Sequence, residues 1–198
     1  GINFGIRHKF GLGHTVPYLQ INAHYHHQEI DADFWSNDRF GLSAEVGKHV
    51  TDSMSLALSV SYSSMDGEKG NVIVPELSSR VFDQDFWRAS LFVDYILSQD
   101  WLVSAEYSRR EGDFHSACTP ENVAKALETM QVKAITSDEV FGGCVYQVDG
   151  SNNTYSANLS YAISRHSALN LSVEFYDGSV DILEYDGSKV QLSYNYRY

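Results

Sequence analysis

Three residues of the stretch DFHSAC could together activate a nucleophile. Asp113, His115 and Ser116 are the residue types of a hydrolase triad, in which histidine takes the proton of serine and aspartate orients the histidine. Three such residues so close in sequence are rarely arranged for that relay, and no nucleophile-elbow pattern accompanies them. We therefore expect a polar loop here and assign no catalytic residue.

Two histidines of the stretch HYHH could bind a metal ion. His24 and His26 share one face of an expected strand, about 7 Å apart along it, so both could reach a single ion. His27 points to the opposite face. Because a metal site needs a further ligand at a defined spacing, we expect hydrogen-bonding histidines and assign no metal.

Cys118 and Cys144 are the only two cysteines. In an oxidising compartment, a pair that brackets one loop predicts a disulfide. It would close about 27 residues and restrict the unfolded loop by about 3 to 4 kcal/mol in the chain-entropy model. Metal binding by two cysteines alone is disfavoured, since zinc would require further ligands.

A short helix is expected inside the long loop over residues 111–152. Thr119 can cap it, Pro120 takes the first helical position, and the helix would continue to about Met130. An ordered loop of this kind could dock a protein partner. A disulfide that only protects the loop from proteolysis is an equally good interpretation.

Acidic residues concentrate in several expected loops. Carboxylate oxygens can bind calcium or magnesium at a surface, but none of these loops has the spacing of a recognised calcium loop, so a solvated acidic surface is favoured. The residues are Asp31, Asp33, Asp38, Asp66, Glu68, Glu76, Asp177, Asp181, Glu184 and Asp186.

The elements that would position these residues are strands. Apolar and polar residues alternate with a period of two, which predicts half-buried strands, and the 13 Tyr and 10 Phe beside only 3 Pro agree with this. We count about nine such segments, near residues 2–9, 19–26, 40–46, 53–63, 85–97, 101–108, 155–163, 169–175 and 190–198.

The two faces of these strands differ in an unusual way. The polar faces carry mainly small residues with scattered charges of both signs, which fits the crowded interior of a narrow barrel. The apolar faces end in aromatic residues, as from Trp87 to Tyr95, which is typical of a membrane interface. The expected charge network of the lumen is Arg7, Lys9, Glu45, Arg88, Asp94, Glu106, Glu174 and Arg197.

The connections alternate in length. The short links GKHVTDSM, LSQDWL and SRHSAL alternate with long acidic ones near residues 29–39, 64–85, 109–153 and 177–188. Short turns on one side of the sheet and long loops on the other are typical of outer-membrane barrels. The net charge of -12 argues against nucleic acid as a partner, and no run approaches the roughly 18 apolar residues of a spanning helix.

Together these features resemble a bacterial outer-membrane β-barrel. The last strand is similar to the C-terminal signal read by the barrel-assembly machinery, although the usual final residue is Phe and here it is Tyr. The signal positions are Val190, Leu192, Tyr194, Tyr196 and Tyr198. The resemblance implies contact with outer-membrane lipids and lipopolysaccharide, and a periplasmic C-terminus.

The expected fold is all-β: one domain over residues 1–198, a transmembrane antiparallel up-and-down barrel with a short helix in a long extracellular loop. Because such barrels usually have an even number of strands, about ten are expected. We favour a missing N-terminal strand; the alternatives are a tenth strand hidden in a loop, for example near Asn71–Val74, and a first segment that folds differently. The expected function is non-catalytic: a structural, anchoring or protein-binding barrel whose lumen is filled by side chains. A narrow channel and a lipid- or lipopolysaccharide-modifying enzyme are alternatives.

Overall fold

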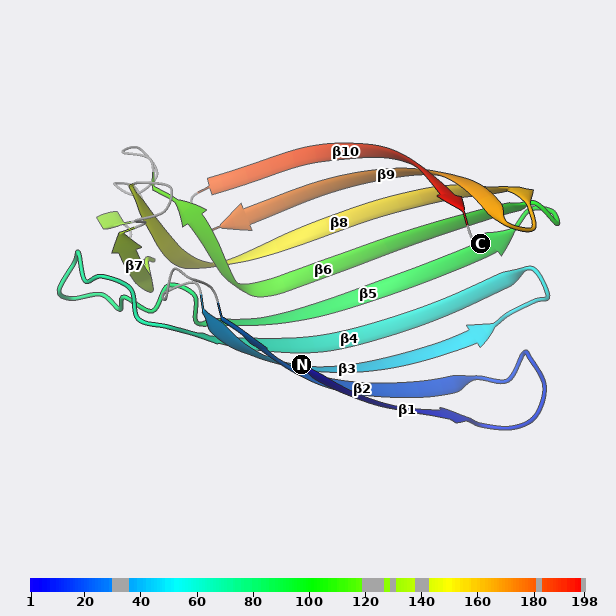
Figure 1. The fold of residues 1–198 in the computed structure, drawn as a ribbon, viewed down its shortest axis with the longest axis horizontal. Coiled ribbons are helices and arrows are strands. Elements are labelled where there is room, and N and C mark those ends of the chain that lie inside the picture. Colours follow the sequence, from blue (N-terminus) through cyan, green and yellow to red (C-terminus); the bar gives the residue numbers. More distant parts are fainter. Residues whose placement is uncertain (30–35, 119–126, 129–130, 138–142, 181–182, 197–198) are drawn as a thin grey trace.

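The computed structural model describes residues 1–29, 36–118, 127–128, 131–137, 143–180 and 183–196. They form one antiparallel sheet of ten strands (Figure 1). The strands are β1 (Ile2–Lys9), β2 (Tyr18–Gln28), β3 (Asn37–His49), β4 (Met54–Gly67), β5 (Gln84–Ile96), β6 (Trp101–Ala117), β7 (Ala134–Ser137), β8 (Cys144–Ser164), β9 (Ser167–Val180) and β10 (Leu183–Tyr196). Each pairs with the next along the chain, except that β6 pairs with β8 and β7 lies off this path beside β8.

All nine segments predicted from the alternation are strands. The tenth, β7, has four residues and lies inside the expected long loop. The stretch near Asn71–Val74 is not a strand, but its Val72 forms an isolated bridge with Thr136 of β7. Of the expected helix only Leu127 and Glu128 are described, and they are helical; the rest lies outside the described residues.

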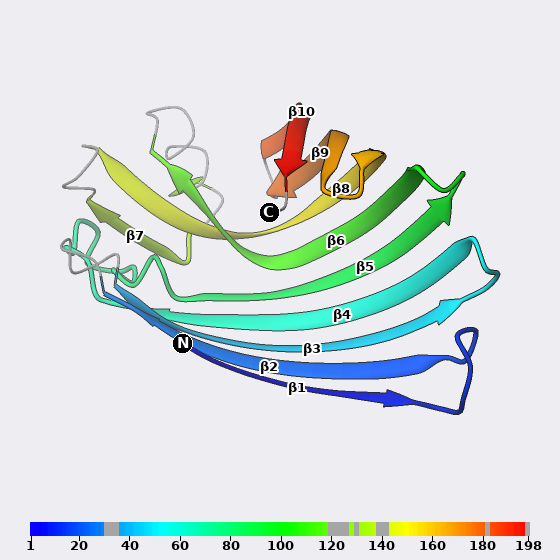
Figure 2. The ribbon, with the colours of Figure 1, turned by 45° about the vertical axis from the view of Figure 1, so that its right-hand side comes forward.

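The sheet is not closed, and the prediction of a closed barrel is wrong for this chain. β1 pairs only with β2, and β10 only with β9, so both are edges of a strongly curved open trough (Figure 2). The reason is the direction in which the two edge strands run. In a meander, the first and the ninth strand of the path run the same way, so they cannot close an antiparallel ladder with each other.

Long connections gather at one end of the sheet and the tighter turns at the other (Figure 1), as the sequence predicts. The prediction of a long loop near residues 177–188 is wrong, because β9 extends to Val180 and β10 begins at Leu183. β6 and β8 also continue as paired strands far into the region 111–152. Among the described residues no helix has the length and apolar character needed to cross a membrane.

The two faces of the sheet are exposed to very different degrees. Leu58 and Leu91, opposite each other on β4 and β5, are 55% and 45% exposed. On the other face Ser90 and Ser108 are only 3% and 8% exposed, although they are small and polar. Because a curved sheet crowds the side chains on its concave side, we assign the polar face to the inside of the trough and the apolar face to the outside.

The apolar core of the described residues lies at the end with the long connections. It contains Met65, Val81, Phe82, Val132, Ala134, Ile135, Val145, Tyr146 and Val148. We call this module the cap, defined as the described residues of 65–83, 113–118 and 131–148. It therefore packs as a small globular unit, whereas the rest of the sheet has an uncovered apolar face.

Candidate functional site

The cap is built around β7. This strand pairs with Cys144–Gln147 of β8, on the edge that β9 leaves free because β9 pairs with β8 only from Ser151 onward. The loop between β4 and β5 is tied to β7 from its other side, where the amide of Ile135 donates to the carbonyl of Ser78 at 2.8 Å. Three distant segments thus enclose two clusters of buried apolar residues, and β7 contributes to both.

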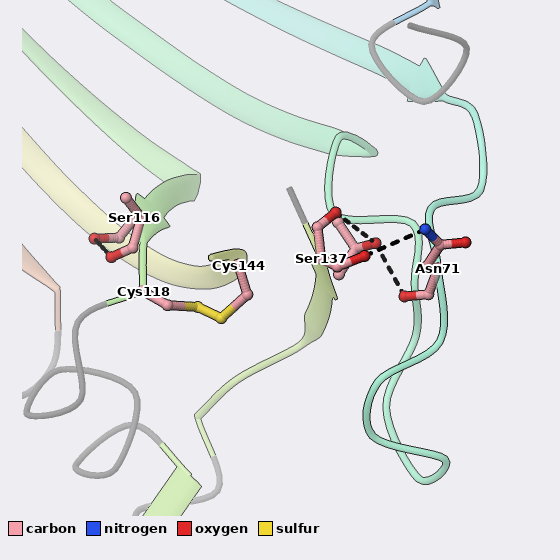
Figure 3. Close-up of a disulfide and its surroundings, with 7 residues drawn as sticks. Asn71, Ser116, Cys118, Ser137 and Cys144 are labelled. Carbon is pink, nitrogen blue, oxygen red and sulfur yellow. Dashed lines mark hydrogen bonds between the residues drawn. A yellow bond between two sulfur atoms is a disulfide. The ribbon is translucent and has the colours of Figure 1, made fainter. Parts of the chain in front are cut away.

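A disulfide joins Cys118 at the end of β6 to Cys144 at the start of β8, as predicted (Figure 3). Their Cα atoms are 5.1 Å apart, and the amide of Cys118 donates to the carbonyl of Cys144 at 2.7 Å. Both cysteines pack against the core of the cap. Nearby, the Asn71 amide donates to Ser137 Oγ at 3.2 Å and Thr136 Oγ1 donates to the Asn71 carbonyl at 3.0 Å. The bridge therefore anchors a module that also has its own packing.

An ion cluster joins the cap to the sheet. Lys133 Nζ lies 2.7 Å from Asp113 Oδ1 and 2.6 Å from Asp149 Oδ1. The Asp113 side chain is only 9% exposed and also accepts a hydrogen bond from the amide of Asp85. Burial alone would lower the pKa of Lys133, but its bonds to the two carboxylates outweigh this and raise that pKa above its usual value.

The residues of DFHSAC do not assemble into a proton relay. Asp113 is committed to Lys133, and the His115 Nδ1 atom faces the side-chain amide of Gln84 at 3.0 Å. Ser116 Oγ donates to the carbonyl of Ala117 at 3.4 Å. Consecutive residues of a strand point to opposite faces, so His115 and Ser116 are separated by the backbone of β6.

His24 and His26 lie on the same face of β2, as expected. No group of three or more His, Cys, Asp or Glu suitable for a metal ion occurs within the described ranges. The other histidine of the stretch, His27, is paired through Nδ1 with Asp38 Oδ1 at 2.8 Å. The residues therefore provide no built metal site.

Several of the acidic loop residues, for which a solvated surface was expected, bind protein groups. Asp66 Oδ1 lies 2.7 Å from Arg80 Nη1, and Asp177 accepts a hydrogen bond from Asn153 at 2.9 Å. Asp31, Asp33 and Asp181 lie outside the described residues. In the same region burial raises the pKa of Asp83, and a bond from the amide of Gly67 offsets this only in part.

The expected lumen charges lie on the polar face of the sheet. Arg7 stacks on the ring of Tyr18 at 3.7 Å, and the Tyr18 hydroxyl donates to Glu45 at 2.8 Å. No ion pair joins two of the seven described members, and Arg197 lies outside the described residues. Arg7 and Glu45 are therefore held by the ring and the hydroxyl of one tyrosine, Tyr18.

Sequence reasoning missed a set of aromatic residues that lie over glycines of the neighbouring strand. Tyr18 covers Gly47, and Tyr185 covers Gly178, each directly opposite in register and on the polar face. Covering a glycine with an aromatic ring is a known stabilising device of curved sheets. The signal that could have found these pairs is the register, which the sequence alone does not specify.

The expected assembly-signal residues share one face of β10. Val190, Leu192, Tyr194 and Tyr196 are between 58% and 69% exposed. The fifth, Tyr198, lies outside the described residues. Their exposure leaves this edge strand with an uncovered apolar stripe.

A cleft of 580 Å³ opens beside the cap, at the end of β6, β8, β9 and β10. Phe114, Val148 and Val180 form apolar walls, and Tyr146 and Tyr185 contribute aromatic rings. Its volume lies within the range of small-molecule sites, about 300 to 1,000 Å³. The remaining lining residues are His115, Ser116 and Glu184.

Comparison with models of protein families, with curated proteins and with solved structures finds no match to this chain.

Proposed function

We propose that the open sheet of this chain forms the larger part of a bacterial outer-membrane β-barrel and anchors the cap outside the cell as a structural or protein-binding module. The observation that carries this proposal is the apolar face of the sheet, which remains uncovered across nine strands while the cap has a separate buried core. In water so large an apolar surface would be an aggregation hazard. In a bilayer it is the surface that faces lipid and lipopolysaccharide.

Aromatic pairs at both ends of the apolar face support this proposal. Toward the turns, the rings of Trp101 and Tyr161 stack at 4.5 Å; toward the cap, Tyr107 and Tyr155 lie 5.1 Å apart. On β5 the apolar run from Trp87 to Tyr95 covers eight steps of about 3.3 Å, roughly 26 Å along the strand. This is the scale of the apolar band of an outer-membrane barrel, about 25 Å.

The orientation of the proposed barrel in the membrane follows from the lengths of its connections. Long connections of outer-membrane barrels face outward and short turns face the periplasm, so the cap lies outside and the end of β10 lies on the periplasmic side, where the barrel-assembly machinery would bind its signal. An antiparallel barrel requires one further strand between β1 and β10, giving ten strands along the closed path.

A narrow channel is the second candidate. The polar lining of the concave face favours it, because a closed barrel would direct the small residues around Ser90 and Ser108 into its lumen. Conductance in a planar bilayer separates the two functions. A stable open level would support a channel, and its absence in well-inserted protein would support an anchor.

Two adjacent residues test the membrane proposal. Leu91 lies on the apolar face and Phe92 on the polar face, opposite Glu106. We expect Leu91→Arg to weaken insertion by about 2 to 4 kcal/mol near the centre of the bilayer. Phe92→Arg should be tolerated.

Folding into lipid vesicles, followed by the different migration of unboiled and boiled protein on gels, measures this contrast. Equal behaviour of the two variants, or a native protein that stays soluble and monomeric without detergent, would contradict the proposal.

A further inference from the structure

Two arginines face each other on the concave side of the sheet, next to the cleft. Arg88 of β5 and Arg110 of β6 are directly opposite in register, so their side chains leave the same face. Neither forms an ion pair with any described residue: Glu111, the carboxylate next to Arg110 in sequence, pairs with Arg109, and Asp113 pairs with Lys133. Opposed like charges destabilise a sheet, so an anion bound between them would be stabilising.

Arg110 is held in a fixed position. Its guanidinium lies 4.1 Å from the ring of Phe86 and 4.2 Å from the ring of Phe114, and its Nη2 donates to the carbonyl of Asp113. The Nε atom is buried and has no hydrogen-bond partner among the described residues. A buried donor without an acceptor is costly, and a rigid guanidinium is suited to bind a carboxylate.

The same arginine adjoins the cleft. Phe114, which stacks on Arg110, lines the cleft. Tyr185 lines it too, and its ring covers Gly178. The strand pairings place Tyr185 at the same level of the sheet as Arg110. Tyr146 also lines the cleft; it is only 1% exposed, and its hydroxyl has no hydrogen-bond partner in the described part of the chain. The cleft thus has apolar walls and a buried hydroxyl, and one of its walls, Phe114, contacts the fixed cation of Arg110.

We propose that this cleft binds a small organic acid. The apolar body of the ligand lies against Phe114, Val148 and Val180, and its carboxylate binds the guanidinium groups of Arg110 and Arg88. Glu184 is exposed at the rim and disfavours anions there, so the acid group enters toward the arginines. The site does not require membrane insertion, and its failure would leave the anchoring function unaffected.

The test uses the full chain folded in a zwitterionic detergent, which favours neither sign of charge. Calorimetric titration with 3-phenylpropionate should show saturable binding, with much weaker binding of 3-phenylpropylamine and of inorganic phosphate. Binding of the amine at least as tightly as the acid would overturn the proposal. Phosphate that binds as tightly as the acid would also overturn it, because the apolar walls would then contribute nothing.

Variants locate the site. Arg110→Gln should weaken 3-phenylpropionate binding by about tenfold or more, because a charge-assisted hydrogen bond is lost. Arg109→Gln is the matched control: Arg109 is adjacent, lies on the opposite face and pairs with Glu111, so binding should not change. If Arg110→Gln does not fold, Arg88→Gln carries the same expectation. Unchanged affinity in a folded arginine variant of the concave face would refute the assignment.

Discussion

Removing the disulfide should loosen the cap and leave the sheet intact. Cys118 and Cys144 are separated by 26 residues in sequence, and the segment between them contains β7 and the core residues Val132 and Ile135. In the chain-entropy model, a loop of this length stabilises the folded state by about 3.5 kcal/mol. Since each 1.4 kcal/mol is a factor of ten, the paired change Cys118→Ser and Cys144→Ser should increase opening of the cap a few hundredfold.

Amide hydrogen exchange measures this opening directly. The amides of Lys133 and Ile135 donate to the carbonyls of Gln147 and Ser78 at 2.9 and 2.8 Å, so they report on the closed cap. Their protection should fall by the expected factor in the double variant and in reduced native protein. Amides of β2 and β3 are the internal control, because these strands lie outside the bridged segment.

Two results would refute this reasoning. A loss of protection below about tenfold would mean that packing of the cap, rather than the bridge, holds β7 in place. An equal loss in β2 and β3 would mean that the cap and the sheet unfold as one cooperative unit.

The remaining predictions concern the ion cluster and the concave face. Lys133→Met should destabilise the cap by about 1 to 2 kcal/mol, because Asp113 stays buried without its cation while the lysine is partly solvated; limited proteolysis of the cap measures this. Because the pKa of Lys133 is raised, its contribution is complete below the ordinary lysine pKa of about 10.4 and is lost as pH rises through the folded value. Gly47→Val should displace the ring of Tyr18 and lower the denaturant midpoint in detergent, whereas Ala44→Val on the apolar face should not.

The strands could be predicted from the sequence because their alternation is a local property. Leu56, Leu58 and Val60 occupy every second position of the sequence, whichever strand their own strand pairs with. β7 lacks such a signal: its four residues become a strand only because β9 leaves an edge of β8 free and Ser78 binds the other side. A contact such as Val72 with Thr136 depends on tertiary packing, which no local pattern specifies.

The incorrect prediction of a long loop near residues 177–188 has a similar cause. Asp and Gly favour turns, yet Asp177 pairs with Asp186 and Gly178 with Tyr185 in a regular ladder. The tyrosine ring covers the glycine and stabilises an extended strand there. The cysteine pair, by contrast, could be predicted because two cysteines allow a single connection. The triad could be doubted because its residues are so close in sequence, although the polar loop expected there is part of β6.

If the sheet lies in a bilayer, as proposed, the two halves of the molecule depend on different surroundings. The cap encloses its own apolar core and carries a disulfide and an ion cluster, which stabilise a fold in water. The sheet buries small polar residues and exposes Leu58 and Leu91, an arrangement that the proposed bilayer would stabilise. Substitutions on the apolar face should therefore impair insertion without changing exchange in the cap, and loss of the bridge should do the reverse. That separation follows from anchoring and would not arise in a soluble sheet, where a single core would couple both halves.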